Sequence, residues 1–273
     1  MAHRICISLI ILVAVAPHVF SQTPAKKQAP AQKKVHKRAH AHNDYLHARP
    51  LLDAVDNGFC SVEADVVLVK GQLLVAHTFL GLRPQRTLKA LYLDPLQKLV
   101  QQNGGSVHGD GTPFTLLIDF KTDGESTYRA VDKLLETYPG LFASSKDGVE
   151  KKGPVIAIAS GSRPTQAIAA DVSRFIGIDG RIPDLHSKRS ESLMPLISDN
   201  WRNHFTWRGK GEMPVDEQAK LVAMVKQAHQ AQRRLRFWAS PDVEAVWKEL
   251  DSAGVDLINT DDLPGLRRYF EAK

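Results

Sequence analysis

Short runs of β-branched and apolar residues alternate with segments of helical pattern along most of this chain. Such alternation predicts an α/β fold, in which helices cover a parallel sheet that is either closed as a barrel or open and doubly wound. The 273 residues fit one (β/α)8 barrel of about 250 residues. The expected strands span 39–42, 61–67, 72–76, 114–120, 155–159, 175–178, 235–238 and 255–259, and the expected helices 127–138, 165–171, 215–232 and 242–253.

Polar residues at the ends of the expected strands favour the closed barrel. Loops at the carboxyl ends of the strands build the active site of a TIM barrel, so polar side chains collect there. Asn43 and Asp44 follow the first strand, Asp119 and Lys121 close the strand at 114–120, and 259–262 closes the last. The first strand is not followed by the G-x-G-x-x-G pattern of dinucleotide-binding folds. We therefore predict a single TIM-barrel domain over residues 39–273.

The N-terminal segment has the pattern of a secretory signal peptide. Arg4 gives a positive start, residues 5–16 are apolar, and small residues precede a cleavage site after Ser21. The apolar run is shorter than the roughly 20 residues that cross a bilayer. We expect a signal peptide at 1–21, a basic flexible linker at 22–38, and a secreted or periplasmic protein.

The positive charge of the chain is confined to this N-terminal segment. The formal net charge is +6, but seven of the 36 basic residues and none of the acidic ones lie in 1–38. Residues 39–273 therefore carry 29 basic and 30 acidic residues, which argues against a nucleic-acid-binding domain. The mature chain retains one cysteine, Cys60, so an intramolecular disulfide is excluded and a buried core position is expected.

Two acidic residues share one face of an expected inner strand. Glu63 and Asp65 are two residues apart, so their side chains point the same way. Buried carboxylates need basic partners or a cation. Asp119 can approach from the next strand, and three carboxylates suit Mg²⁺ or Ca²⁺. The alternative is that one of these acids pairs with Lys121.

Histidines flank these acids. His40 and His42 lie on the first strand, and His77 ends the short strand downstream of Asp65. Imidazole is the side chain best suited to exchange protons near neutral pH, and two of them can serve the attacking and the leaving oxygen.

Two other classes of function remain open at this point. The H-x-H pair of His40 and His42 is also typical of amidohydrolase-type metal hydrolases, although His186, His204 and His229 fall in apparent loops or helices. A non-catalytic secreted barrel could instead bind a phosphorylated or sugar ligand.

Four motifs resemble the phospholipase C-like phosphodiesterase superfamily, which includes glycerophosphodiester phosphodiesterases, sphingomyelinase D enzymes and phosphatidylinositol-specific phospholipases C. They are H-N-D-Y at 42–45, E-A-D at 63–65, V-A-H at 75–77 and I-D-F-K at 118–121. The segments F-W-A-S at 237–240 and V-D-L-I-N-T-D at 255–261 resemble its closing strands. H-N-D-Y is most similar to the altered-inheritance-of-mitochondria-type branch.

The resemblance implies a metal-dependent phosphoric diester hydrolase that acts on a glycerophosphodiester or a phospholipid-type substrate. By similarity, His42 and His77 are the general base or nucleophile and the general acid. The spacing to E-A-D favours His42 over His40. Glu63, Asp65 and Asp119 would hold one Mg²⁺ or Ca²⁺, and Lys121 would contact phosphate. Further substrate contacts are expected from Asn43, Trp238 and Asn259.

Peripheral membrane contact is a further hypothesis. The segment 187–210, with Trp201 and Trp207, could form a lipid-facing lid, and it could equally be an ordinary packed loop.

Overall fold

The computed structural model describes residues 34–273, so the predicted signal peptide and most of the predicted linker lie outside the described residues. Strand β1 (His36–Ala41) begins three residues before the expected domain boundary. His36 pairs with Phe59 of the neighbouring strand, and the Arg38 side chain is bound by Asp251. Residues 36–38 therefore belong to the barrel, because their backbone and charges have partners there.

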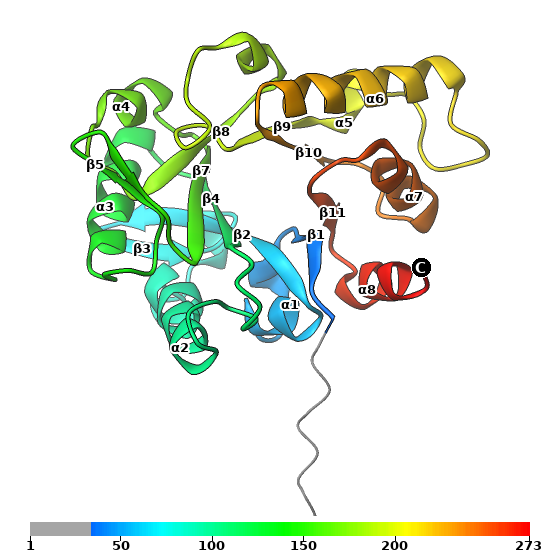
Figure 1. Ribbon diagram of the computed structural model, residues 1–273. Coiled ribbons are helices and arrows are strands. Elements are labelled where there is room, and N and C mark those ends of the chain that lie inside the picture. The colour runs from blue at the N-terminus through cyan, green and yellow to red at the C-terminus, as the bar shows by residue number, and fades with distance from the viewer. Residues whose placement is uncertain (1–33) are drawn as a thin grey trace, which may run out of the picture. The chain divides into compact units, whose positions relative to one another are not determined.

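Eight parallel strands form the barrel within residues 34–273, in the order β10-β9-β8-β7-β4-β2-β1-β11 (Figure 1). An isolated parallel bridge between Arg236 and Leu257 joins β10 to the segment that leads into β11 and closes the ring. This confirms the predicted TIM barrel. After β1 the strands are β2 (Phe59–Val69), β4 (Phe114–Phe120), β7 (Val155–Gly161), β8 (Ile176–Gly180), β9 (Leu196–Asn200), β10 (Arg234–Trp238) and β11 (Ile258–Thr260).

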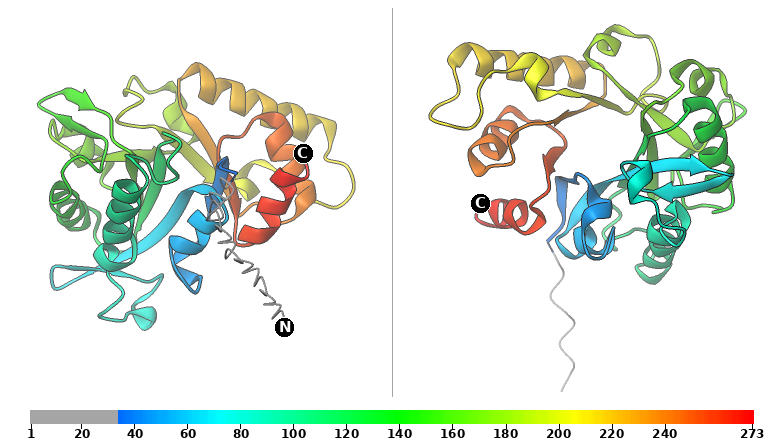
Figure 2. Two further views of the ribbon diagram at one scale, coloured as in Figure 1. Left: turned by 60° about the horizontal axis from the view of Figure 1, so that its bottom comes forward. Right: turned by 180° about the vertical axis from the view of Figure 1, so that it is seen from behind.

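Helices cover the outside of these strands (Figure 2). Helix α6 buries Leu221, Met224, Val225 and Ala228, the stripe that its helical spacing predicts. Helix α7 ends at Gly254, whose φ of 86° is the left-handed conformation that glycine adopts without strain. The helices are α1 (Leu52–Asp56), α2 (Asp94–Gln102), α3 (Gly124–Glu136), α4 (Thr165–Ala170), α5 (Trp201–His204), α6 (Val215–Gln230), α7 (Glu244–Ala253) and α8 (Leu263–Glu271).

Three of the described strands lie outside the barrel ring. Strand β3 (Gln72–Val75) pairs antiparallel with the end of β2 and carries the chain to His77. Strands β5 (Ser144–Lys146) and β6 (Val149–Lys151) form a separate hairpin. Cys60 is buried in β2, as expected. None of the helices in residues 34–273 is long and apolar enough to span a membrane.

The two tryptophans of the segment 187–210, which a lid would expose to lipid, are packed in the core instead. The segment contains β9, which sequence periodicity missed because Leu196 and Ile197 are followed by three polar residues. Trp201 is fully buried and its ring centroid lies 4.1 Å from that of Phe205 and 5.7 Å from that of Phe237. Trp207 is also buried, and its carbonyl accepts a hydrogen bond from the Trp201 indole. The lid hypothesis was therefore wrong.

Replacing Trp201 by Ala is expected to lower the free energy of unfolding by about 3–5 kcal/mol, because it empties a packed aromatic site. Urea unfolding measures this change. Val215→Ser, at a position that is 82% exposed, is the matched control and should change stability by less than about 0.5 kcal/mol. An effect of Trp201→Ala as small as that of the control would show that the indole is not part of the core.

Candidate active site

A cavity of about 500 Å³ lies at the carboxyl ends of the barrel strands. Seven of the nine site residues predicted from the sequence line this cavity, and Asp65 and Asn259 do not. The lining residues are His42, Asn43, Glu63, His77, Asp119, Phe120, Lys121, Ser160, Gly161, Ser162, Arg181, Arg236 and Trp238. The side chains therefore come from β2, β4, β7 and β10 and from the segments that follow β1, β3, β4, β7 and β8.

Strand register brings the three predicted carboxylates together. Asp65 of β2 is the direct partner of Asp119 in β4, and Glu63 lies two residues earlier on the same face of β2. One oxygen from each of the three lies within 4.8 Å of the others. This spacing places them within reach of one bound cation.

Basic side chains approach the same carboxylates. Lys121 Nζ lies 3.1 Å from Asp65 Oδ2 and 3.2 Å from Asp119 Oδ1. Arg236 donates to Glu63 Oε2, and its Nε donates to Asn259 Oδ1 at 2.9 Å. Asn259 thus orients Arg236 rather than lining the cavity. Periodicity missed Arg236, although its place two residues before Trp238 puts both on one face of the strand.

The oxygens of Asp65 indicate that these carboxylates can also hold a metal ion. Asp65 is 1% exposed, and its Oδ2 accepts from Tyr45 Oη at 2.9 Å and lies 2.7 Å from His77 Nδ1. Its Oδ1 is buried without a hydrogen-bond partner. An unsatisfied buried carboxylate oxygen between two other acids fits a hard divalent cation.

Each cavity histidine has its Nδ1 beside an aspartate. His77 contacts Asp65, and His42 Nδ1 lies 2.9 Å from Asp261 Oδ1. Asn43 Nδ2 is 2.8 Å from the same His42 nitrogen, so it can donate when Nδ1 carries no proton. When Nδ1 carries a proton, it donates a hydrogen bond to the aspartate. Nε2 of each imidazole is then available to exchange a proton with a ligand. Asp261 was visible in the sequence only as part of the polar strand end at 259–262.

His40 has a different environment from His42. It is fully buried, with Nδ1 2.7 Å from Ser61 Oγ and Nε2 3.5 Å from Glu63 Oε2. Burial and the positive charge of Arg236 lower the pKa of His40 to about 3. His40 does not line the cavity and so cannot exchange protons with a ligand there, whereas His42 does line it, so the geometry favours His42.

The pKa values of two acidic residues in the cavity, Glu63 and Asp119, are shifted in opposite directions. Burial raises the pKa of Glu63, but Arg236 and His40 outweigh it and hold that pKa well below its usual range. Burial raises the pKa of Asp119 to about 6. The positive charge of Lys121 opposes this rise, and the negative charges of Glu63 and Asp65 add to it. Glu63 is therefore ionised already, while a further positive charge would favour ionised Asp119.

A second network of hydrogen bonds positions two further cavity residues, Ser160 and Arg181. Asp179 of β8 is fully buried and accepts from Ser160 Oγ at 2.7 Å, Ser198 Oγ at 2.6 Å and Arg181 Nη1 at 2.9 Å. This network fixes Ser160 and Arg181 at the cavity. The sequence gives little sign of it, since Asp179 is a single acidic residue between Ile178 and Gly180 at the end of a short apolar run.

Comparison with known families agrees with this geometry. The AIM6-like phosphodiesterase domain matches residues 31–179, more than half of the chain. The chain belongs to the AIM6-like phosphodiesterase family. A second match, to the Glycerophosphoryl diester phosphodiesterase family, covers residues 234–264 and includes Arg236, Trp238 and Asn259. The resemblance expected from the sequence motifs is confirmed.

The similarity to two relatives in this family extends over most of the chain. Altered inheritance of mitochondria protein 6 of Eremothecium gossypii is 30% identical over 268 residues, which cover 85% of this chain and 69% of that protein. Its homolog in Arthroderma benhamiae is 28% identical over 270 residues, which cover 85% of this chain and 83% of that protein.

A solved structure shares the fold. It is a calcium-dependent phosphoinositol-specific phospholipase C from a Gram-negative bacterium, Pseudomonas sp., with a TM-score of 0.53 and 15% identity. The match covers 86% of this chain and 93% of that chain. This comparison supports the barrel architecture of the AIM6-like domain and no more.

The first two residues of the H-N-D-Y motif line the cavity, and the third has a structural role. His42 and Asn43 line the cavity, and Asn43 has the left-handed φ of 48° that asparagine tolerates better than most residues. Asp44 is fully buried and its Oδ2 accepts from the Leu51 N–H at 2.6 Å. Burial raises the pKa of Asp44 to about 7, and that hydrogen bond offsets only part of the rise.

Because the pKa of Asp44 is raised in the folded state, its contribution to stability is complete below about pH 4 and is lost as the pH rises through 7. This contribution should fall by roughly 2–3 kcal/mol between pH 5 and pH 8. Urea unfolding of the wild type and of Asp44→Asn at both pH values isolates it, since the asparagine variant should lack this component of the pH dependence. Equal pH dependence in the two proteins would contradict a raised pKa.

Proposed function

We propose that this protein is a divalent-cation-dependent phosphoric diester hydrolase that acts on a glycerophosphodiester or a phospholipid-type substrate. The observation that carries the proposal is the pairing of His42 and His77 with aspartates, in one cavity with Glu63, Asp119 and Lys121. The family to which the chain belongs supports this class of reaction.

His42 and His77 would carry the protons of the reaction. With Nδ1–H donated to Asp261, His42 Nε2 can remove a proton from the attacking oxygen or attack phosphorus itself. His77, held by Asp65, can donate a proton from Nε2 to the leaving oxygen. Each aspartate fixes the orientation of the ring of its histidine through the contact at Nδ1.

Cations of the cavity would neutralise the charge that develops on the phosphoryl oxygens. Lys121 and Arg236 line the cavity and are fixed by their contacts with carboxylates. Glu63, Asp65 and Asp119 would hold Mg²⁺ or Ca²⁺, which supplies Lewis-acid stabilisation when bound. Trp238 lines the same cavity and offers an apolar wall to the rest of the substrate.

The proposal includes export. The predicted signal peptide at residues 1–21 supports a site of action outside the cytoplasm, in the periplasm or beyond the cell.

An amidohydrolase-type site is less compatible with the described residues. That chemistry would need both His40 and His42 at the cavity, but His40 is bound to Ser61 and is inaccessible. His204 and His229 lie 3.3 Å and 2.9 Å from Asp199 and Asp256, and neither lines the cavity. A binding protein remains the alternative that a turnover assay separates from the proposed hydrolase.

Metal removal tests the proposal directly. Phosphorus NMR with glycerophosphocholine, lysophosphatidylcholine, sphingomyelin or phosphatidylinositol should show a phosphomonoester or cyclic phosphate in Mg²⁺ or Ca²⁺ and no product in EDTA. Glu63→Gln should lower turnover by at least about 10²-fold, because it removes charge from the cation site. Calorimetric titration with each metal gives a readout independent of turnover, with Glu212→Gln at an exposed position as control. Turnover that persists in EDTA would contradict metal dependence.

The histidine roles are tested by His42→Gln and His77→Gln. Each should lower turnover by about 10²–10⁴-fold, since each removes an acid or base from the reaction. His186→Gln is the matched control, because His186 is exposed and lies away from the cavity. Full activity of either cavity variant would remove that histidine from the mechanism.

A further inference from the structure

Large apolar side chains are exposed on two loops beside the candidate active site. Leu46 is 72% exposed, Phe79 65% and Leu80 93%. Leu46 directly follows the H-N-D-Y motif, and Phe79 begins the 3-10 helix η2 (Phe79–Gly81), two residues after His77. The apolar tips therefore belong to the same loops that position His42 and His77.

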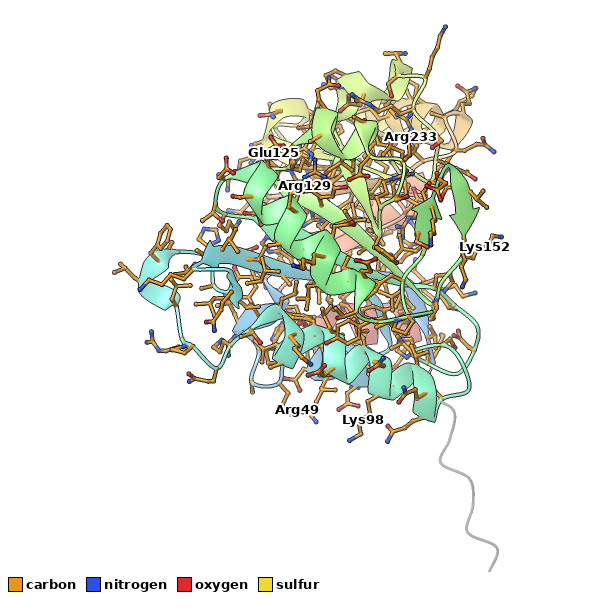
Figure 3. All side chains as sticks on the ribbon, turned by 90° about the vertical axis from the view of Figure 1, so that its left-hand side faces the viewer. Arg49, Lys98, Glu125, Arg129, Lys152 and Arg233 are labelled. Atoms are coloured by element: carbon orange, nitrogen blue, oxygen red, sulfur yellow. The ribbon has the colours of Figure 1, made fainter. Side chains whose placement is uncertain are left out.

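Contacts join the two loops that carry these apolar side chains. Arg86 donates to the backbone carbonyl of Tyr45 and so ties the segment after β3 to the segment after β1. A shared groove is lined by both loops, including Leu46, His77 and Gly81. The segment between β3 and α2, cyan in the ribbon, projects from the body of the barrel in two views (Figure 2, left, and Figure 3).

The charge around these tips has one sign. Residues 66–93 contain Lys70, Arg83, Arg86 and Lys89 and no acidic residue. Arg83 Nη1 folds back onto the loop and donates to the carbonyl of Leu82 at 2.8 Å. Among the described residues, no carboxylate lies within salt-bridge distance of Arg83 or Arg86, whereas Lys89 pairs with Asp94. Within residues 34–273, the guanidinium groups of Arg83 and Arg86 therefore have no carboxylate partner.

Exposed aromatic and leucine side chains with unpaired basic residues are the combination that binds the interface of an anionic bilayer. The apolar groups enter the boundary between headgroups and acyl chains, while arginines remain at the level of the lipid phosphates. A protein partner with an acidic, apolar surface would meet the same residues. The position of the tips beside the cavity mouth favours lipid, because the substrate class proposed above includes phospholipids.

We infer that Leu46, Phe79 and Leu80 dock this protein on an anionic phospholipid surface, with Arg83 and Arg86 at the headgroups. Docking turns the cavity mouth beside His77 towards the bilayer. The further consequence, that the substrate is a phospholipid within the membrane rather than a soluble diester, rests on the proposed hydrolase function.

Vesicle co-sedimentation of the purified protein tests the docking surface. The wild type should bind vesicles of phosphatidylcholine mixed with phosphatidylserine at least about tenfold more tightly than vesicles of phosphatidylcholine alone. Phe79→Ser combined with Leu80→Ser should weaken binding to the mixed vesicles by at least about tenfold, and Arg83→Gln by about fivefold.

Val149→Ser combined with Val215→Ser is the matched control, since these valines are 70% and 82% exposed elsewhere in the chain. It should bind as the wild type does. Thermal unfolding of each variant checks that the exposed substitutions leave the fold intact.

Three results would overturn the docking surface. They are no binding of the wild type to mixed vesicles, equal loss in the control variant, and self-association that Phe79→Ser and Leu80→Ser abolish in the absence of vesicle binding. The last result would assign the surface to a second copy of the chain. Wild-type turnover of phosphatidylinositol and lysophosphatidylcholine dispersed in micelles of a nonionic detergent needs no docking on a bilayer. It therefore reports separately on the hydrolase function, so that failure of one proposal is distinguishable from failure of the other.

Discussion

The buried carboxylate of Asp65 connects the parts of the candidate site. One oxygen receives the Tyr45 hydroxyl, His77 and Lys121, while the other has no hydrogen-bond partner. These contacts join the loop after β1, the end of β3 and the end of β4 to β2. The cost of burying this charge is met only when all of these groups are in place. The same residue thus orders the loops and leaves an oxygen for a cation.

A second buried charge pair spans the barrel. Arg236 of β10 reaches Glu63 of β2 and is oriented by Asn259 of β11. Since β1 and β11 lie between these strands in the ring, the pair bridges the interior across the point of closure. Burial and the Arg236 charge together lower the pKa of His40, and Arg236 with His40 lowers the pKa of Glu63. Stability and electrostatics of the site therefore depend on the same side chains.

Much of this arrangement follows from the sequence, and the exceptions have physical causes. The two-residue spacing of Glu63 and Asp65 is enough to place both on one strand face, and the apolar runs of β2, β4 and β7 are long enough to be recognised. Strand β9 was missed because only two apolar residues begin it, and Trp201 was misjudged because sequence does not show which way an aromatic side chain points. Partners brought from distant strands, such as Arg236 for Glu63 and Asp261 for His42, depend on barrel closure and leave no local pattern.

The seam between β10 and β11 pairs at one position, whereas every other pair of neighbouring barrel strands pairs at two or more. A single bridge between Arg236 and Leu257 and two amide donations to the Leu235 carbonyl complete it. Local opening of a fold begins where backbone pairing is sparse. Opening of this seam would separate Asn259 from Arg236, whose guanidinium Asn259 orients. Motion of α7 and α8 on the outside of the barrel would therefore change the position of a cavity charge without any contact between these helices and the ligand.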